Sequence, residues 1–124
     1  MNTITHRLVA LYAVLIIALC SACTSPRTTS GRLLATSART VDAAMQAWAQ
    51  YVVITHPAPE QEARVRAAYE AWQSAMRVAV DAWIATAQRQ DDATLAQWDI
   101  AWRSLGANEA ELLNVIAYFR GRNK

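Results

Sequence analysis

From residue 32 onward, apolar residues recur at alternating intervals of four and three positions, which is the spacing of one face of an α-helix. Two long segments carry this pattern most clearly. The first contains Leu34, Ala38, Val41, Met45, Trp48 and Val52, and the second contains Val65, Tyr69, Trp72, Met76, Ala79 and Trp83. No segment shows the two-residue alternation of a half-buried strand. The chain is therefore predicted to be all-α.

Helix-breaking residues mark where these helices begin and end. Proline occurs only at positions 26, 57 and 59, and glycine only at positions 31, 106 and 121. Pro57 disfavours helix at His56, so the first helix is expected over 32–55. Pro59 suits the first turn of a helix, which predicts the second helix over 59–89.

The next segment is expected to form a third helix over 92–105. Asp91 or Asp92 can cap its start, because a short carboxylate side chain accepts hydrogen bonds from the first backbone N–H groups of a helix. The apolar positions of this segment are Leu95, Trp98, Trp102 and Leu105. Gly106 is placed to end the helix.

A short further helix is expected over 109–120 as a continuation of the third. Asn108, with Glu111 three residues later, has the form of a capping box, and Leu112, Ile116 and Phe119 continue the apolar spacing. The whole pattern predicts an antiparallel three-helix bundle whose third helix is broken. The alternative is a helical hairpin that forms homo-oligomers through the same apolar faces, as a coiled coil does.

The first residues have the layout of a secretory signal peptide. Residues 1–7 are polar and include Arg7, and the thirteen residues from Leu8 to Cys20 carry no charge. A helix that spans a bilayer needs about 20 apolar residues, and this run is shorter. An uncleaved membrane anchor is therefore the weaker alternative.

The end of that run, Leu19-Cys20-Ser21-Ala22-Cys23, resembles the lipobox of bacterial lipoproteins. The resemblance implies that residues 1–22 are removed and that Cys23 is acylated, for example with palmitate, as the first residue of the mature chain. Cys20 departs from the aliphatic residue that is usual at its position. A redox pair of Cys20 and Cys23 would need a folded setting that activates a thiolate, and an export signal does not supply one.

Residues 23–31 are expected to be the lipidated cysteine and a flexible tether, because 24–31 are rich in Ser and Thr and include one Pro and one Gly. The helical domain would then span 32–124. Of the twelve basic residues only Arg7 precedes position 23, so the mature chain carries eleven basic and ten acidic residues. This near-neutral balance argues against nucleic acid as a partner.

The sequence offers little for catalysis. The mature chain has one histidine, His56, and it lies between predicted helices in a proline-flanked loop. There is no Glu-x-x-His pair for a zinc or di-iron site and no glycine-rich phosphate loop. Asp91 and Asp92 are better explained as a helix cap than as an acid and base pair. We therefore predict a non-enzymatic protein without a cofactor or metal.

Five tryptophans, at positions 48, 72, 83, 98 and 102, all lie on the predicted apolar faces. Their simplest interpretation is a core of large aromatic side chains with alanines between them. The alternative is that Trp98 and Trp102, one turn apart, are exposed as a platform for a glycan strand or a partner helix.

These features predict a small lipid-anchored envelope protein that faces the periplasm and acts as a tether or interaction module. Its partners would be the membrane, through the anchor, and another envelope protein or peptidoglycan. Thr24 stands where many Gram-negative lipoproteins that stay at the inner membrane have Asp, which favours the outer membrane. The alternative is a prophage lysis protein of the spanin kind, which links two membranes.

Lys124 is the only lysine and the last residue of the sequence. In the major outer-membrane lipoprotein of enteric bacteria, which is also a lipid-anchored heptad helix, a terminal lysine is joined to peptidoglycan. The similarity is limited to the anchor, the helical pattern and the lysine. The simpler interpretation is that a basic tail suits the negative end of the last helix.

Overall fold

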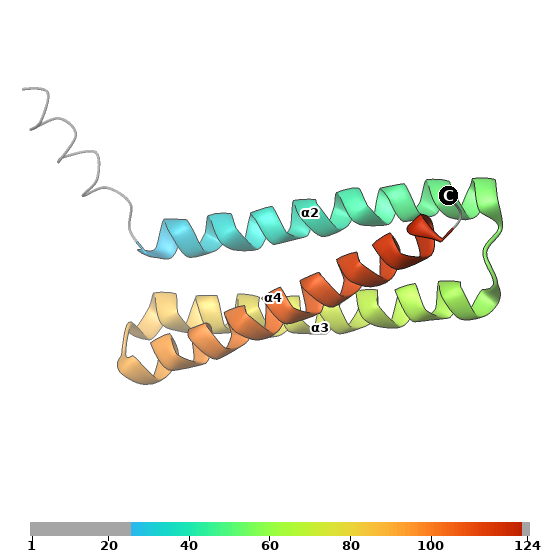
Figure 1. Ribbon diagram of the computed structural model, residues 1–124. Coiled ribbons are helices and arrows are strands. Elements are labelled where there is room, and N and C mark those ends of the chain that lie inside the picture. The colour runs from blue at the N-terminus through green and yellow to red at the C-terminus, as the bar shows by residue number, and fades with distance from the viewer. Residues whose placement is uncertain (1–25, 123–124) are drawn as a thin grey trace, which may run out of the picture.

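The computed structural model describes residues 26–122, which form three helices joined by short connections: α2 (Pro26–Thr55), α3 (Pro59–Arg89) and α4 (Asp92–Gly121). Successive helices run in opposite directions, so the start of α2 and the end of α4 lie at opposite ends of the molecule (Figure 1). Residues 26–122 contain no strand. The all-α prediction is confirmed, and the single chain forms a three-helix bundle by itself.

The start of α2 differs from the prediction. The helix begins at Pro26, six residues before the expected start at Arg32, so most of the predicted flexible tether is helical. Pro26 favours this start because its fixed φ suits a first helical turn. Gly31 lies inside the helix, where a Cβ atom would come within 3.1 Å of the Trp83 ring. This glycine therefore leaves room for the Trp83 ring of α3 against the backbone of α2 and does not break the helix.

The two connections end their helices with left-handed residues. His56 has φ 49° and donates its backbone N–H to the Val52 carbonyl over 3.0 Å, which closes α2. Gln90 has φ 51° and donates in the same way to Thr86 at the end of α3. Pro59 lies in the first turn of α3, as predicted. The α2–α3 connection has three residues and the α3–α4 connection has two. Because both connections are so short, neighbouring helices are antiparallel.

Asp91 caps α4, which decides between the two predicted capping residues. Its carboxylate accepts a hydrogen bond of 2.8 Å from the Thr94 backbone N–H, and the Thr94 hydroxyl donates to the Asp91 carbonyl. The hydrogen bond from the Thr94 backbone lowers the pKa of Asp91, because it stabilises the charged carboxylate. The cap fixes the first turn of α4.

The predicted break in the third helix is wrong, because α4 is continuous from Asp92 to Gly121. The Asn108 side chain donates to the Ser104 carbonyl over 2.9 Å, one turn back in the same helix, and does not cap a new one. A helical glycine costs about 1 kcal/mol relative to alanine. Leu105 and Leu112, both fully buried on either side of Gly106, offset that cost by packing in the core.

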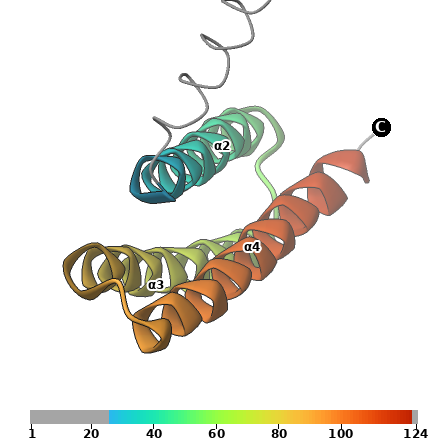
Figure 2. The same ribbon diagram turned by 90° about the vertical axis from the view of Figure 1, so that its left-hand side faces the viewer.

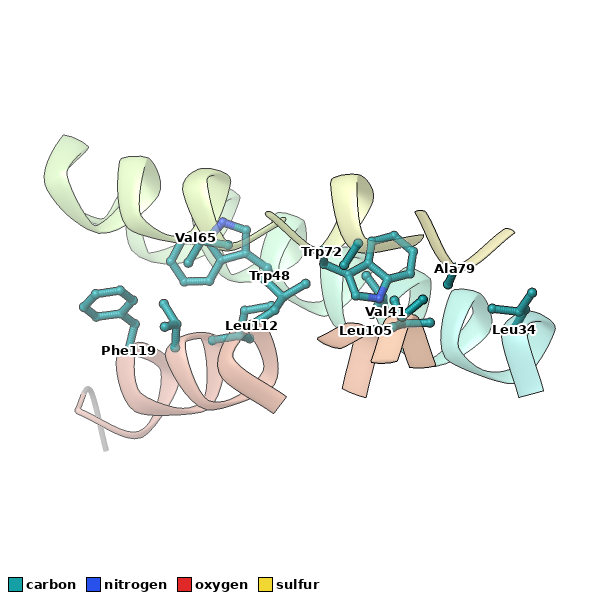
Figure 3. Packing of buried hydrophobic residues seen from close by; sticks show 13 residues of the cluster. Leu34, Val41, Trp48, Val65, Trp72, Ala79, Leu105, Leu112 and Phe119 are labelled. Atoms are coloured by element: carbon teal, nitrogen blue, oxygen red, sulfur yellow. The ribbon is translucent and has the colours of Figure 1, made fainter. Parts of the chain in front are cut away.

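The three helices are not equally spaced. Helices α3 and α4 lie close together, whereas α2 lies over both of them at a greater distance (Figures 1 and 2). Figure 3 shows Trp48 and Trp72 among the aliphatic core residues that the three helices supply. The buried core consists of Leu34, Val41, Trp48, Val65, Trp72, Ala75, Ala79, Ala101, Leu105, Leu112, Val115, Ile116 and Phe119.

Most of the predicted apolar faces lie in this core or pack against it, with two exceptions. Ala38 is exposed and Ser37 is buried in its place, and Leu95 is 48% exposed beside buried Thr94. A polar contact accompanies each shift. Ser37 bonds to α3 and α4, and the Thr86 hydroxyl of α3 donates to the Thr94 carbonyl.

Candidate functional site

The two terminal sites predicted from sequence, Cys23 and Lys124, lie outside the described residues, as does the signal peptide over 1–22. The described chain begins at Pro26, two residues after Thr24, and its last helix ends at Gly121. The tryptophan platform can be placed. Trp98 and Trp102 stack on each other along α4 with ring centroids 5.8 Å apart.

Trp98 and Trp102 are half-buried and pack against the core, in contrast to Trp48 and Trp72, which are buried. The five tryptophans are therefore not equivalent. Trp83 is also half-buried and faces Gly31 of α2. The core interpretation holds fully for Trp48 and Trp72, and each of the other three residues is partly exposed.

A groove of about 370 Å³ runs between α2 and α4, and it is the best candidate for a binding site near the predicted platform. Its walls include Leu33 of α2 and Leu113 of α4, and Trp102 lies at its side. Gly106 also lines the groove, and since it has no side chain it leaves the middle of the α4 wall open. Trp98 does not line this groove, so only one member of the predicted pair belongs to it.

A chain of hydrogen bonds forms the polar edge of this groove and joins all three helices. The Trp72 indole N–H of α3 donates to the Ser37 hydroxyl of α2 over 3.3 Å. Ser37 in turn donates to the Glu109 carboxylate of α4 over 2.5 Å. Ser37 is only 4% exposed, so its hydroxyl needs these partners. We call Trp72, Ser37 and Glu109 the polar bridge.

The polar bridge was not predicted from the sequence. Ser37 stands one position before the expected apolar residue Ala38, and Glu109 stands at the expected start of a separate helix. Nothing in the spacing of either residue distinguishes it from a surface residue. A weak signal was available in Trp72, because a buried indole N–H usually finds a hydrogen-bond acceptor.

A second groove, of about 540 Å³, lies between α3 and α4. Its lining includes small side chains, among them Ala82 and Ala85 of α3 and Ala101 of α4. Val78 and Ile100 also line this groove and are 59% and 68% exposed. This groove was not predicted, because an alanine-rich helix pattern does not reveal which alanines, such as Ala82 and Ala85, remain partly exposed.

The end of the bundle opposite Pro26 carries an exposed aliphatic pair. Val53 and Ile54, near the end of α2, are 72% and 80% exposed. The adjacent end of α4 is held in place, since the Tyr51 hydroxyl donates to the Phe119 carbonyl over 3.1 Å and the Arg64 guanidinium lies 5.5 Å from the centre of the Phe119 ring. We call Val53 and Ile54 the distal pair.

The titratable residues considered from sequence do not converge. His56 is exposed in the α2–α3 connection, and Asp91 and Asp92 lie at the other end of the bundle at the start of α4 (Figure 1). Within residues 26–122, no group of three or more His, Cys, Asp or Glu side chains is placed to hold a metal ion. No helix in this range is long and apolar enough to cross a membrane.

Comparison of the chain with protein-family models, with curated proteins and with solved structures finds no match in any of the three. A proposal about function therefore depends on the two grooves, the polar bridge and the distal pair.

Proposed function

We propose that the protein is a non-catalytic, lipid-anchored component of a bacterial envelope, attached through Cys23 to the periplasmic face of the outer membrane. The helical bundle acts as a stiff support that holds an interaction site away from the lipid surface. The partner is an apolar segment of another envelope protein, which binds in the groove between α2 and α4.

The observation that carries this proposal is the position of Pro26. Only two residues separate it from Cys23, so the bundle follows the proposed anchor almost directly. A helix of 30 residues is about 45 Å long. Antiparallel packing sets the distal pair and the end of α4 at the end of the bundle opposite Pro26 (Figure 1).

The groove between α2 and α4 supports an interaction role. Protein partners often bury aromatic side chains at the centre of a contact, and Trp102 is a half-exposed aromatic side chain in an apolar groove. Glu109 adds a carboxylate at the edge, which would favour a partner segment with a basic residue. The polar bridge keeps this wall fixed, because it joins α2, α3 and α4 at one point.

Metabolic labelling with palmitate tests the anchor. The wild-type chain should incorporate label, fractionate with membranes and have the mass of residues 23–124 plus lipid. Cys23→Ser should abolish the label and leave the precursor unprocessed, whereas the matched control Cys20→Ser should leave labelling intact. A soluble, unlabelled wild-type protein would contradict the lipoprotein proposal, and a membrane-bound protein of full length would favour the uncleaved anchor.

The distal pair favours a second candidate function, a lysis protein that links two membranes. Two adjacent aliphatic residues at the end opposite Pro26 could insert into a second bilayer surface. In a vesicle assay, vesicles that carry the anchored chain should cluster bare vesicles. Replacement of Val53 and Ile54 by serine should abolish clustering, whereas Ile84→Ser, at an exposed site on α3, should not. Equal clustering by both variants would exclude this candidate.

A further inference from the structure

The connection between α2 and α3 consists of His56, Pro57 and Ala58, and we call it the hinge. His56 and Ala58 are exposed. The backbone hydrogen bonds of the hinge stay within the flanking helices, because His56 donates to Val52 of α2 and Ala58 accepts from Gln61 of α3. Within residues 26–122, no backbone hydrogen bond joins the hinge to α4. The hinge can therefore change its conformation without breaking a backbone hydrogen bond to α4.

The backbone of the hinge is strained at His56. Its φ of 49° lies in the left-handed region, which is unfavourable for a residue that has a Cβ atom. Pro57 follows it, and a residue before proline prefers an extended backbone. Gln90 at the end of α3 is also left-handed, but Asp91 follows it and does not restrict it in this way. Straightening the hinge would therefore relieve strain that the α3–α4 connection does not have to the same degree.

The inner face of α2 needs the α3–α4 pair, but not the pair of its own chain. This face carries Leu34, Val41 and Trp48, which are buried in the core. If α2 swung out alone, these side chains would be exposed to water, which is unfavourable. Every other copy of the chain offers the same α3–α4 surface. A second copy can therefore receive α2 through identical contacts, and only the hinge has to change.

We propose that the protein forms a dimer by exchange of α2, in which α2 of each copy packs on α3 and α4 of the partner subunit. Short hinges under strain favour such an exchange, and two-fold symmetry closes the dimer. The polar bridge then joins two chains, since Ser37 of one copy donates to Glu109 of the partner subunit and accepts from Trp72 of the partner subunit. The groove between α2 and α4 is rebuilt in the same way, with Leu33 from one copy and Trp102 of the partner subunit.

The exchange also gives the distal pair a contact. With the hinge straightened, α2 continues away from the start of α3, so the two bundles meet end to end at their hinges. Val53 and Ile54 lie in the last turn of α2, next to the hinge, and are largely exposed in a single bundle. In the exchanged dimer the distal pairs of both copies lie beside the two-fold axis. Their burial there adds to the stability of the dimer.

The first test uses the full chain, made in bacterial cells with the photo-crosslinking residue p-benzoylphenylalanine at Leu33, which lines the groove on α2. In a single bundle this residue links α2 to α4 of the same chain, whereas in the exchanged dimer it links two chains. Irradiation should therefore produce a covalent dimer, with the link between α2 and α4. The matched control carries the same residue at Gln46, which is exposed on α2. Equal dimer yields from the two positions, or no dimer from position 33, would overturn the proposal.

The length of the hinge then decides between the single bundle and the dimer. Insertion of Gly-Gly-Ser after Pro57 lets α2 fold back without strain and should lower the dimer yield about tenfold. The matched control has the same insertion after Gln90, in the α3–α4 connection, and should keep the yield of the wild type. Deletion of Ala58 should raise the yield, because a two-residue hinge with proline cannot easily reverse the chain.

A complementary pair of variants detects the exchange independently of the hinge. Gly31→Leu sets a large side chain against the Trp83 ring, since even a Cβ atom would lie 3.1 Å from it. Trp83→Ala leaves a gap at the same place. In a mixed exchanged dimer the altered α2 meets the altered α3, and the two unaltered helices meet each other, so both contacts fit. When the two variants are made together with different tags, the mixed dimer should exceed both dimers of a single variant.

Two further results would contradict the exchange. If mixed dimers and dimers of a single variant form in the statistical ratio, α2 does not pack on the partner subunit. If the insertion after Pro57 leaves the dimer yield unchanged, the two copies touch through another surface. The exchange requires neither acylation of Cys23 nor a partner in the groove, so a negative palmitate experiment would overturn the proposed function and leave the exchanged dimer standing.

Discussion

The contact between α3 and α4 and the contact of α2 with that pair are built from different kinds of side chain. Helices α3 and α4 approach closely and bury small residues, among them Ala75, Ala79 and Ala101. Helix α2 lies farther away and is joined to them by large aromatic residues and by the polar bridge. Small residues bring helix backbones together, whereas aromatic residues fill a wider gap.

The attachment of α2 therefore depends strongly on a few aromatic and polar contacts, in addition to the buried Leu34 and Val41. Trp48 of α2 packs against Phe119 of α4 with ring centroids 6.2 Å apart, and Ser37 of α2 accepts the Trp72 hydrogen bond. The α3–α4 contact is spread over many small side chains instead. We therefore expect single substitutions to weaken the attachment of α2 more sharply than they weaken the α3–α4 pair.

The largest effect is expected from Trp72→Ala. This change leaves a cavity between α2 and α3, removes the hydrogen bond to Ser37 and should lower the free energy of unfolding by about 3–5 kcal/mol. Urea unfolding followed by circular dichroism measures it. Trp98→Ala, at a half-buried ring, should cost clearly less. Equal costs at the two positions would contradict the distinction between core and half-exposed tryptophans.

Ser37→Ala should have the next largest effect. It leaves the Trp72 N–H and the Glu109 carboxylate without the partner that joins them, at a cost of about 1–3 kcal/mol in the free energy of unfolding. Thr36→Ala is the matched control, because the exposed Thr36 hydroxyl bonds to the Arg32 carbonyl of its own helix. If both substitutions cost the same, the polar bridge does not attach α2.

Gly106→Ala should stabilise the protein, by about 1 kcal/mol, because Gly106 is helical and an added Cβ would meet no atom within 4 Å. Gly31→Ala should gain less or nothing, since its Cβ would crowd the Trp83 ring at 3.1 Å. Melting temperatures of the two variants compare the open and the close-packed glycine directly. A destabilised Gly106→Ala would restore the broken-helix prediction.

The smallest effect concerns the cap of α4. The folded pKa of Asp91 lies below its ordinary value of about 4, so the charged carboxylate stabilises the fold above that pH, and this contribution is lost as the pH falls through the folded pKa. Asp91→Asn keeps a capping side chain but has no charge to lose. The stability of wild type relative to Asp91→Asn should therefore decline on acidification. A pH-independent difference would contradict the charged cap.

The sequence predicted the helices well where two signals agreed. Pro59 and Asp91 each combine a local preference with the onset of an apolar pattern, and both helix starts are where they were expected. The prediction failed at Gly31 and Gly106, where glycine was taken as a breaker. At Gly31 the reason for glycine is a residue 52 positions away, Trp83, and local sequence does not contain that information.

The candidate sites were less predictable than the fold. Trp102 was identified because tryptophan is large and its position follows from helical spacing. The groove beside Trp102 is also formed by Leu33, from a helix that is distant in sequence, and by Gly106, which has no side chain to fill it. The polar bridge requires a 72-residue separation between Ser37 and Glu109. Such pairings are properties of the assembled bundle, which helical periodicity alone does not define.

Native-state hydrogen exchange of the full chain tests the difference between α2 and the α3–α4 pair most directly. We predict that buried amides of α2, such as Val41, open at a lower free energy than those of Ala79 and Leu105, and that Ser37→Ala lowers the opening energy of α2 alone. If all three helices exchange with one common free energy, and Ser37→Ala lowers it equally for all of them, α2 is not a separately attached helix.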